Sequence, residues 1–503
     1  MSSTPSKIVN VSQLPQPILA GHPQWVELYR FAWGLAATHI RKSRGRHHMD
    51  AAWNPAHNYQ WVWDTCFMAL YCRYGGGEYP GVNSLDNFYD LQREDGYIAM
   101  TYDMDTGEEP WPDRINPPLF AWVEWEHYRM TGDASRLARV VVSIEKLMGW
   151  IDAHRRNRPH RRMKATDSPP DGQGESQDLY SLYYFEDGGS SGMDNSPRTP
   201  RLREAGQMFD WVDLSCQMAL SFRMLGCMHE VLANLEKAEY WKKRARELGE
   251  LINAELWAER TRFYHDRCIP KNFSGHKTVA GFWLILAGIC PPERLDALVE
   301  HLLDKREFNR PTPVPALSAD DVNYSEQGRY WLGGVWAPTN YMVTRGLMLA
   351  GRGDMAHDIA CRYLGVLAQT FASVEPHTLW EAYAPEANMP ANAPYLDELV
   401  KPDFVGWTGI GPIAMLIENV IGLDICSPER LIIWDIRLTE QHGVRNLSIG
   451  EGKADFVCSA RSDAQSPATL EIRSTVAWTA ILRRGTVEKR ITLMPGKTET
   501  VVV

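Results

Sequence analysis

The sequence predicts a mainly α-helical protein, an (α/α)6 toroid of six helical hairpins, followed by a small C-terminal β-sandwich module. Between residues 23 and 424, apolar residues recur at helical spacing in twelve successive segments, and no strand pattern separates them. Such a series suggests six hairpins closed into a ring. From residue 425 onward the chain shows short, β-branched, partly alternating segments separated by turn residues. An open helical solenoid is the competing architecture, but the sequence has no fixed-period repeat to support it.

The individual elements follow from these patterns in chain order. After a proline-rich stretch, Trp25, Leu28, Tyr29 and Ala32 fall near one face of the first helix. The predicted helices lie at 23–44, 61–74, 80–94, 117–131, 133–155, 207–232, 235–259, 275–289, 291–306, 335–352, 353–371 and 405–422. The predicted strands lie at 431–434, 454–458, 469–472, 476–482, 487–493 and 498–503. We therefore expect an N-terminal tail at 1–22, a toroidal catalytic domain at 23–424 and a β-sandwich module at 425–503.

The irregular, aromatic segments of the toroid fall mostly before its even-numbered helices. They are 57–63, 92–118, 183–198, 265–276, 324–338 and 377–407. If the even-numbered helices form the inner ring, all six segments meet at one end of it. The sequence therefore predicts one shared cleft at that end.

The amino-acid composition limits the kinds of ligand that this cleft could bind. The chain of 503 residues has a net charge of −10, which argues against nucleic acid or an anionic membrane as a partner. Its 19 Trp and 20 Tyr are many for this length, and aromatic rings often line sugar-binding clefts. The nine cysteines are scattered without a CxxC pair, which favours a reduced interior over disulfides or zinc. Without a signal-peptide pattern or a membrane-spanning apolar segment, we expect a cytoplasmic protein. The sequence leaves open whether it forms a homo-oligomer.

Residues 187–198 form the stretch around which the candidate site is organised. Its glycines and Pro197 exclude a helix or a central strand, so we expect a tightly turned loop. Such a loop can hold the carboxyl group of Asp194 at a fixed angle over a cavity. The alternative is a surface turn in which Asp194 caps the next helix. The next helical pattern begins only near residue 207, too far along the chain for that role.

A second carboxylate is needed if the cleft hydrolyses glycosides with inversion. That reaction uses a general acid and a general base about 6.5–9.5 Å apart. Asp194 is the candidate acid, and Glu381, which lies between Trp380 and Tyr383, is the candidate base. Glu381 could equally be an ordinary surface glutamate at a helix end. Its neighbour Glu386 is the competing base, but it adjoins a segment rich in Ala, Asn and Pro that we expect to be mobile.

Asp64 lies at the start of the second predicted helix and has two interpretations. It could cap that helix or stabilise its first turn through the helix dipole. It could also bind two hydroxyls of a sugar, with Trp61 or Trp63 stacking on the ring. The aromatic residues of 330–336 have the same dual character, since core packing would also explain them.

Several motifs of the chain, taken in order, resemble those of glycoside hydrolase family 63. They are Trp63-Asp64-Thr65, residues 92–98, Asn116-Pro117-Pro118, residues 191–198, residues 330–336, Trp380-Glu381-Ala382-Tyr383 and Gly406-Trp407-Thr408. Residues 191–198 also closely resemble the catalytic-acid loop of the mannosylglycerate and glucosylglycerate hydrolase branch of this family, whose members are related to trehalases. Each motif is weak alone, but together they are specific.

The resemblance implies an (α/α)6 domain and an inverting α-glycosidase with Asp194 as acid and Glu381 as base. It also implies that Asp64 binds the sugar whose bond is cleaved. The expected substrate-binding residues are Tyr59, Trp63, Asp64, Gln92, Asn116, Tyr330, Trp331, Trp336, Trp380 and Trp407. No cofactor or metal is expected, and the substrate would be a small α-linked disaccharide or a glycosyl-glycerate.

The chain departs from the family pattern at three places in the predicted cleft. Ser190-Ser191 stands where a Glu-Ser pair is usual, and Leu332 occupies a position where a basic residue is common. A longer insert also separates Glu381 from Trp407. The substrate could therefore differ from those of known members.

Other functions on the same toroid stay open at this point. A sugar phosphorylase would need a phosphate site in place of the second carboxylate. An epimerase would rely on paired histidines, for which His57, His265, His276 and His377 are available. A non-catalytic carbohydrate-binding protein would need neither Asp194 nor Glu381.

Overall fold

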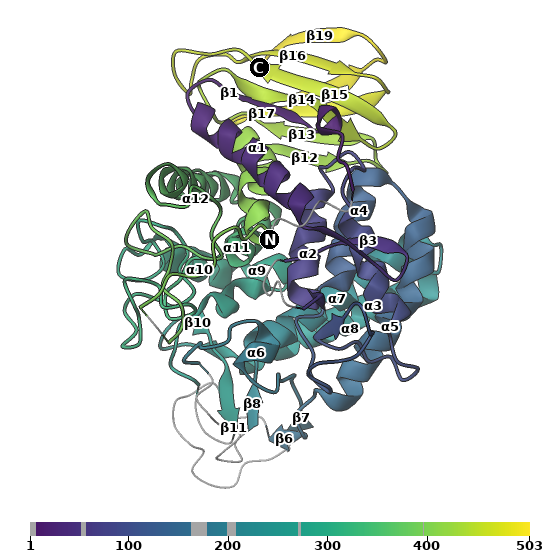
Figure 1. Cartoon of the computed structure of the whole chain (residues 1–503), viewed down its shortest axis with the longest axis vertical. Coiled ribbons are helices and arrows are strands. Elements are labelled where there is room, and N and C mark those ends of the chain that lie inside the picture. The colour runs from purple at the N-terminus through teal and green to yellow at the C-terminus, as the bar shows by residue number, and fades with distance from the viewer. Residues whose placement is uncertain (1–6, 52–56, 162–178, 199–207, 270–272, 396) are drawn as a thin grey trace.

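The computed structural model describes residues 7–51, 57–161, 179–198, 208–269, 273–395 and 397–503. Figure 1 shows a helical body that carries a strand-rich C-terminal region at one end. The longer helices lie between Pro23 and Ile421, and the two largest sheets consist mainly of residues after Leu423. None of the described helices is long and apolar enough to cross a membrane.

Six helical segments of the described chain form a closed circuit in which each packs against the next. They are α2 (Val62–Cys72), α4 (Phe120–Thr131), α7 (Val212–Val231), α9 (Trp283–Ala287), α11 (Ala337–Leu349) and the π-helix η6 (Gly411–Ile421). Together with the short 3-10 helix η5 (Thr408–Ile410), η6 packs back against α2 and closes the circuit. These are the even-numbered helices of the predicted series. Every residue of α2 and η6 is buried, as expected for helices surrounded by protein.

A second set of helices packs outside this circuit. They are α1 (Pro23–Thr38), α3 (Asp86–Asp90) with the 3-10 helix η2 (Gly81–Leu85), α5 (Ala134–His154), α8 (Leu235–Glu255), α10 (Pro292–Leu303) and α12 (Gly353–Ser373). Helix α8 packs on α7, α5 packs on α4 and α7, and α12 packs on α11 and η6. The buried residues of α8 recur along one face, as its spacing predicts. Each of the twelve segments predicted to be helical contains helix in the structure.

The prediction that no strand precedes residue 425 is wrong. The first helix ends at Thr38 instead of continuing to residue 44, and a hairpin of β2 (Ile40–Ser43) and β3 (Arg46–Met49) follows it. Arg44 and Gly45 form its turn with φ angles of 50° and 77°, the left-handed pair that two-residue hairpins favour. Other short pairs are β4 (Tyr59–Trp61) with β5 (Thr101–Asp103), β6 (His160–Arg161) with β7 (Leu179–Tyr180), β8 (Met208–Asp210) with β11 (Arg267–Ile269), and β9 (Trp257–Ala258) with β10 (Phe263–Tyr264). Strands this short show no periodicity in the sequence.

The C-terminal region consists of two sheets that pack against each other. One has the order β1 (Gln16–Leu19), β14 (His442–Ile449), β15 (Gly452–Cys458), β16 (Thr469–Ser474), β19 (Thr498–Val502). The other has the order β12 (Leu423–Cys426), β13 (Leu431–Asp435), β17 (Trp478–Arg484), β18 (Val487–Leu493). The rings of Trp434 in β13 and Phe456 in β15 meet between the sheets, 5.6 Å apart.

Three features of this region were not predicted, and one of them is the short strand β12, which directly follows the last predicted helix. Strand β1 comes from the segment 1–22, which was expected to be a tail, and it pairs in antiparallel register with β14. Strand β14 itself was missed, because a bulge between Val444 and Leu447 breaks its alternation.

A buried network of charged side chains joins the inner helices to the strand-rich region. Arg73, the C-cap residue of α2, bonds to Glu418 of η6 at 2.6 Å and to Glu126 of α4 at 3.3 Å. Arg345 of α11 bonds to Glu126 and to Asp424 of β12, each at 3.2 Å. Burial alone would raise the pKa of Glu126, but the surrounding arginines outweigh it and hold that pKa at about 2. Removing one member would leave an uncompensated buried charge, which is strongly destabilising.

Candidate active site

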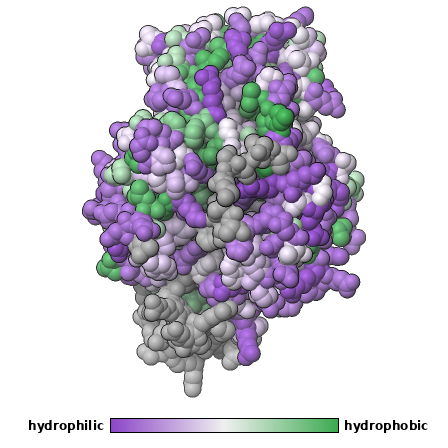
Figure 2. Space-filling view, in the orientation of Figure 1, coloured by the Kyte–Doolittle hydropathy of each residue, from purple (hydrophilic) through white to green (hydrophobic). Residues whose placement is uncertain are grey.

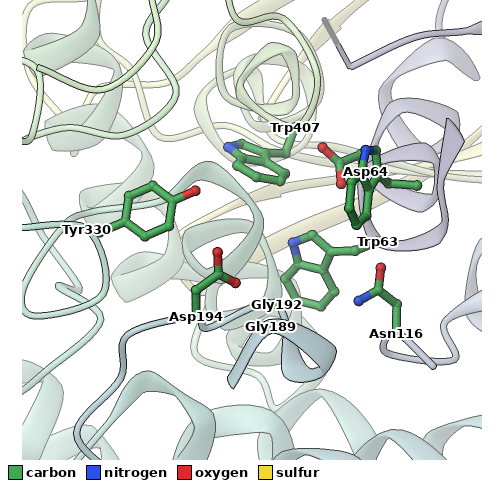
Figure 3. A pocket seen from close by; sticks show the side chains of 9 residues that line it. Trp63, Asp64, Asn116, Gly189, Gly192, Asp194, Tyr330 and Trp407 are labelled. Carbon is green, nitrogen blue, oxygen red and sulfur yellow. The ribbon is translucent and has the colours of Figure 1, made fainter. Parts of the chain in front are cut away.

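One cavity of the helical body opens at the N-terminal ends of the inner helices (Figure 3). Its volume is about 480 Å³, including the part open to solvent. Its lining residues are Trp61, Trp63, Asp64, Asn116, Gly189, Gly192, Asp194, Tyr330 and Trp407. Five of the six segments predicted to converge supply all of these residues except Asp64, which directly follows the segment 57–63. The sixth, 265–276, contributes no lining residue among its described positions.

The loop that carries Asp194 is shaped by its glycines. Contrary to the prediction, it contains one turn of helix, α6 (Gly188–Ser191), whose N-terminus is capped by Asp187 through the Ser190 N–H at 2.9 Å. Gly192 ends this turn with φ of 76° and lies against the ring of Trp63. A Cβ atom at Gly188 would lie only 2.3 Å from the carbonyl oxygen of Asp194. The absence of a side chain at residue 188 is therefore what lets Asp194 lie where it does.

Polar contacts at both ends fix this loop to the rest of the body. Asp187 forms an ion pair with Arg114 at 2.9 Å. The fully buried Arg198 bonds to Asp213 in α7 and to Asp266 beyond β10. These contacts tie the loop to three other parts of the chain.

Asn195 links the same loop to the segment that carries Tyr330. Its side-chain amide donates to the carbonyl of Arg329 at 3.0 Å and accepts from the N–H of Trp331 at 2.9 Å. Asp194 and Tyr330 are therefore held in one rigid unit at the cavity wall.

The carboxyl group of Asp194 points into the cavity (Figure 3). Its side chain is exposed to water through the open part of the cavity. Burial, followed by the negative charges of Glu381 and Asp187, raises the pKa of Asp194 to about 7. A sugar bound in the cavity would strengthen this effect, because it would exclude the solvent that stabilises the charged form.

Glu381 lies behind Tyr330 and is 3% exposed, so it is not a surface residue at a helix end. The phenol of Tyr330 donates to its Oε1 at 2.8 Å, and the backbone N–H of Lys401 donates to its Oε2 at 3.3 Å. The indole N–H of Trp407 holds its backbone carbonyl at 2.9 Å. Burial raises the pKa of Glu381, and the two donors to the carboxylate oppose that rise.

Asp64 is the third carboxyl group of the site. It lies in the first turn of α2, whose N-cap position is Trp61, so Asp64 does not cap the helix. Burial raises its pKa well above the ordinary value, and the charges of Glu381, Asp50 and Asp194 raise it further. Its carboxyl group lies on the side of the cavity away from Asp194, beside Trp407 (Figure 3).

We compared the whole chain with models of known protein families, and the result is consistent with a carbohydrate-cleaving site. Residues 57–397, more than half of the chain, match the model of the mannosylglycerate hydrolase MGH1-like glycoside hydrolase domain. The chain belongs to this family. The protein is therefore a glycoside hydrolase.

Relatives of this MGH1-like glycoside hydrolase include one of similar extent and two that match in part. An uncharacterized protein of Borreliella burgdorferi is 28% identical over 409 residues, 78% of each chain. A probable mannosyl-oligosaccharide glucosidase of Schizosaccharomyces pombe is 30% identical over 169 residues, 31% of this chain and 20% of that protein. A cytosolic neutral trehalase of Kluyveromyces lactis is 29% identical over 136 residues, 26% of this chain and 18% of that protein.

Solved structures share the fold of the MGH1-like chain. The family 63 mannosylglycerate hydrolase of Thermus thermophilus, in complex with glucose, aligns with a TM-score of 0.58 at 18% identity, covering 77% of this chain and 99% of that one. A family 78 rhamnosidase of a Bacillus species aligns with a TM-score of 0.63 at 15% identity, covering 93% of this chain and 42% of that one. Residues 1–424 alone could not supply a coverage of 93% of this chain, so the likeness to the rhamnosidase extends into the strand-rich region.

The structure gives the predicted substrate-binding residues of the MGH1-like enzyme different places relative to the cavity. Trp63, Asp64, Asn116, Tyr330 and Trp407 line the cavity. Trp331, Trp336 and Trp380 are buried behind its wall, where Trp331 and Trp336 stack at 4.2 Å and Trp336 supports Tyr330 from behind. Gln92 does not line the cavity, and its side-chain amide instead donates to the carbonyls of Gly96 and Ser143.

Tyr59 belongs to an aromatic group at the edge of the cavity. Its ring meets that of Trp111 at 5.9 Å, and Trp111 in turn meets Trp61 at 5.1 Å. Trp61 also lines the cavity. The sequence had suggested Trp61, as an alternative to Trp63, as a ring that stacks on the sugar, although the expected set of substrate-binding residues contains only Trp63.

Glu386, the competing candidate for the base, has different surroundings. Instead of lying in a mobile segment, its carboxylate accepts two bonds from Arg310, at 2.6 and 2.8 Å, and one from Tyr324 at 2.6 Å. Burial raises the pKa of Glu386, but these bonds outweigh it and lower that pKa below the ordinary value. A carboxylate held by a guanidinium group has little tendency to accept a proton.

Proposed function

We propose that the protein is an inverting α-glycosidase in which Asp194 is the general acid and Glu381 the general base. The observation that carries this proposal is the different surroundings of two carboxyl groups, that of Asp194 at the cavity and that of Glu381 behind Tyr330 in the cavity wall. Asp194 has a pKa near 7 and faces the cavity, which suits a proton donor at neutral pH. Glu381 is held by two hydrogen-bond donors to its carboxylate, which favour the ionised form that a base requires.

In the proposed reaction a single displacement cleaves the glycosidic bond. Asp194 gives its proton to the glycosidic oxygen as the bond from that oxygen to the anomeric carbon breaks. A water molecule attacks the anomeric carbon from the opposite face, and Glu381 accepts a proton from this water. The products are a β-configured sugar and the free alcohol. Exchange of one proton with solvent then restores both carboxyl groups.

The closed circuit of inner helices supports an (α/α)6 toroid as the architecture of this domain. Helices α2, α4, α7, α9, α11 and η6 would form its inner ring, with the remaining helices outside. This arrangement puts the segments before the inner helices at one end of the ring, where the cavity lies.

The substrate that fits this proposal best is a small α-linked disaccharide or a glycosyl-glycerate. Asp64 would bind hydroxyls of the sugar whose bond is cleaved, with Trp63 and Trp407 packing on its ring. The likeness to a mannosylglycerate hydrolase supports a glycosyl-glycerate as the substrate. The rings of Trp61 and Trp111 at the edge of the cavity support a disaccharide, because a second sugar ring could stack on them.

The other functions considered for the toroid receive less support. Membership of a glycoside hydrolase family sets aside a non-catalytic sugar-binding protein. Among the described residues that line the cavity there is no histidine for an epimerase. His265 bonds to Thr261 and to the carbonyl of His276, and His276 bonds to Asp321, so both imidazoles are engaged with the protein.

Proton NMR during the first minutes of turnover tests the mechanism. The proposal requires the β-anomer as the first product from an α-linked substrate, before mutarotation mixes the two forms. A panel of α-disaccharides and glycosyl-glycerates, with and without phosphate, would identify the substrate class. An α-anomer as the first product, or a sugar phosphate formed only when phosphate is present, would refute the proposal.

A further inference from the structure

Two tyrosine–glutamate pairs connect the same two segments of the chain. Tyr330 donates to Glu381 at 2.8 Å, and Tyr324 donates to Glu386 at 2.6 Å. In each pair the tyrosine comes from the segment 324–338 and the glutamate from 377–407. Of the two pairs, the first reaches the cavity, through Tyr330. The second pair also contains Arg310 and therefore has a permanent cation beside its carboxylate.

Tyr330 is held in a restricted position by its backbone. Both Tyr330 and Arg329 have φ angles in the left-handed region, 65° and 34°, which residues with a side chain adopt only when the surroundings impose it. The N–H of Tyr330 donates to the carbonyl of Asn392, and its own carbonyl accepts from the N–H of Gly334, each at 2.9 Å. The ring rests edge-on against Trp336 at 4.8 Å. The phenol oxygen is thereby fixed in direction as well as in place.

The phenol also stays a donor throughout the accessible pH range. Burial, followed by the charges of Glu381 and Asp194, raises the pKa of Tyr330 well above its ordinary value. A tyrosine that keeps its proton donates a hydrogen bond, and this bond stabilises the ionised form of the carboxylate that accepts it. Glu381 otherwise receives only one hydrogen bond that the structure describes at its carboxylate, from the N–H of Lys401 at a longer 3.3 Å.

We propose that Tyr330 is the positioning residue of the catalytic base: its phenol orients the Glu381 carboxylate toward the attacking water and keeps it ionised. This inference rests on the proposed role of Glu381. It assigns to Tyr330 a function beyond lining the cavity, which would need only a ring and a hydroxyl facing the sugar. The strained backbone of 329–330 is explained in the same way, because it aims the phenol at one oxygen of Glu381.

The decisive variant is Tyr330→Phe, which keeps the ring and removes only the hydroxyl. The acidic limb of the pH profile of kcat/KM reports the base in the free enzyme. Without the phenol, the carboxylate ionises less readily, so this limb should move to higher pH by about one unit. The other charged groups that act on Glu381, namely Lys401, Asp194 and Asp64, are unchanged in the variant. At the optimum pH, kcat should fall about tenfold while KM changes little.

Tyr324→Phe is the matched control, because it removes the same hydroxyl from the equivalent pair outside the cavity. Its pH profile and kcat should equal those of the wild type. Thermal unfolding of both variants would measure any loss of structure separately. If Tyr330 only bound the sugar, its loss would raise KM and leave the acidic limb in place. That result would overturn the proposal, and so would an equal shift of the limb in Tyr324→Phe.

Glu381→Gln separates a failure of this inference from a failure of the proposed function. If Glu381→Gln retains full activity, Glu381 is not the base and both proposals are wrong. If Glu381→Gln is inactive but Tyr330→Phe has the wild-type pH profile, only the positioning role is wrong. The inference stands if Glu381→Gln is inactive and Tyr330→Phe shows the displaced limb.

Discussion

Replacement of Gly188 by alanine should disable the proposed acid without touching its side chain. The new Cβ atom would lie 2.3 Å from the carbonyl oxygen of Asp194 and 2.9 Å from its carbonyl carbon. Neither atom can give way alone, because both belong to the backbone. The loop must therefore move by roughly 1 Å to reach ordinary van der Waals contact, and a displacement of that size at a reacting group can cost about 10²-fold in rate. The crowding itself should lower the free energy of unfolding by about 1–3 kcal/mol.

Two substrates distinguish a misplaced acid from a general loss of structure. An α-linked disaccharide has a poor leaving group that needs the proton of Asp194, whereas an α-glycosyl fluoride needs little protonation. We expect kcat of Gly188→Ala to fall about 10²-fold on the disaccharide and much less on the fluoride. Gly149→Ala is the control, because an alanine at this helical position in α5 meets no atom within 4 Å.

Two results would refute this reasoning. Full activity of Gly188→Ala on the disaccharide would show that the loop tolerates the methyl group without moving Asp194. An equal loss on both substrates, measured at a temperature at which the variant is fully folded, would show that Asp194 does not act as the proton donor.

Three further predictions follow from the same site. Glu381→Gln should lower kcat by about 10²-fold or more, while Glu386→Gln should change it only a few-fold, since Glu386 is already paired with Arg310; the reverse order in steady-state kinetics would show that the base is misassigned. Asp194 acts only when protonated and its pKa is raised to about 7, so kcat/KM should decline as the pH rises through about 7. If kcat/KM already declined as the pH rose through about 4, where an ordinary aspartate titrates, the prediction would be wrong. Dialysis against a chelator should leave activity unchanged, because two carboxyl groups need no Lewis acid, and activity lost by chelation and restored by calcium or zinc would argue otherwise.

The order of the helices could be predicted because each one buries a face or its whole surface. The inner helix α2, buried throughout, and the outer helix α8, buried on one side, both leave a clear apolar pattern. The hairpin at 40–49 could not be predicted in this way, since strands of four residues are too short to show a period. Pairing of β1 with β14 joins residues from the two ends of the chain, and no local pattern encodes such a contact.

The candidate site could be predicted in its carboxyl groups but not in the orientation of its aromatic rings. Asp194 stands out because of its unusual loop, and Asp64 because it opens a helix. The sequence 330–336 does not show that Tyr330 faces the cavity while Trp331 and Trp336 stack behind it. That difference depends on left-handed backbone angles at residues that are not glycine. Likewise, the bond between Tyr330 and Glu381 spans 51 residues and becomes visible only in the folded chain.

The pairing of β1 with β14 gives the start of the chain a role in the stability of its end. Gln16–Leu19 cover the edge of a sheet whose other strands all come from the C-terminal region (Figures 1 and 2 show this region at the top). During synthesis this strand emerges from the ribosome well before β14, because more than 400 residues separate the two partners. A deletion or fusion at the first twenty residues would therefore expose the backbone of β14 as an open edge, a site at which separate molecules can join and aggregate. For the same reason, residues 425–503 expressed alone would lack one of their own strands, and the module cannot be transplanted as a continuous piece of the sequence.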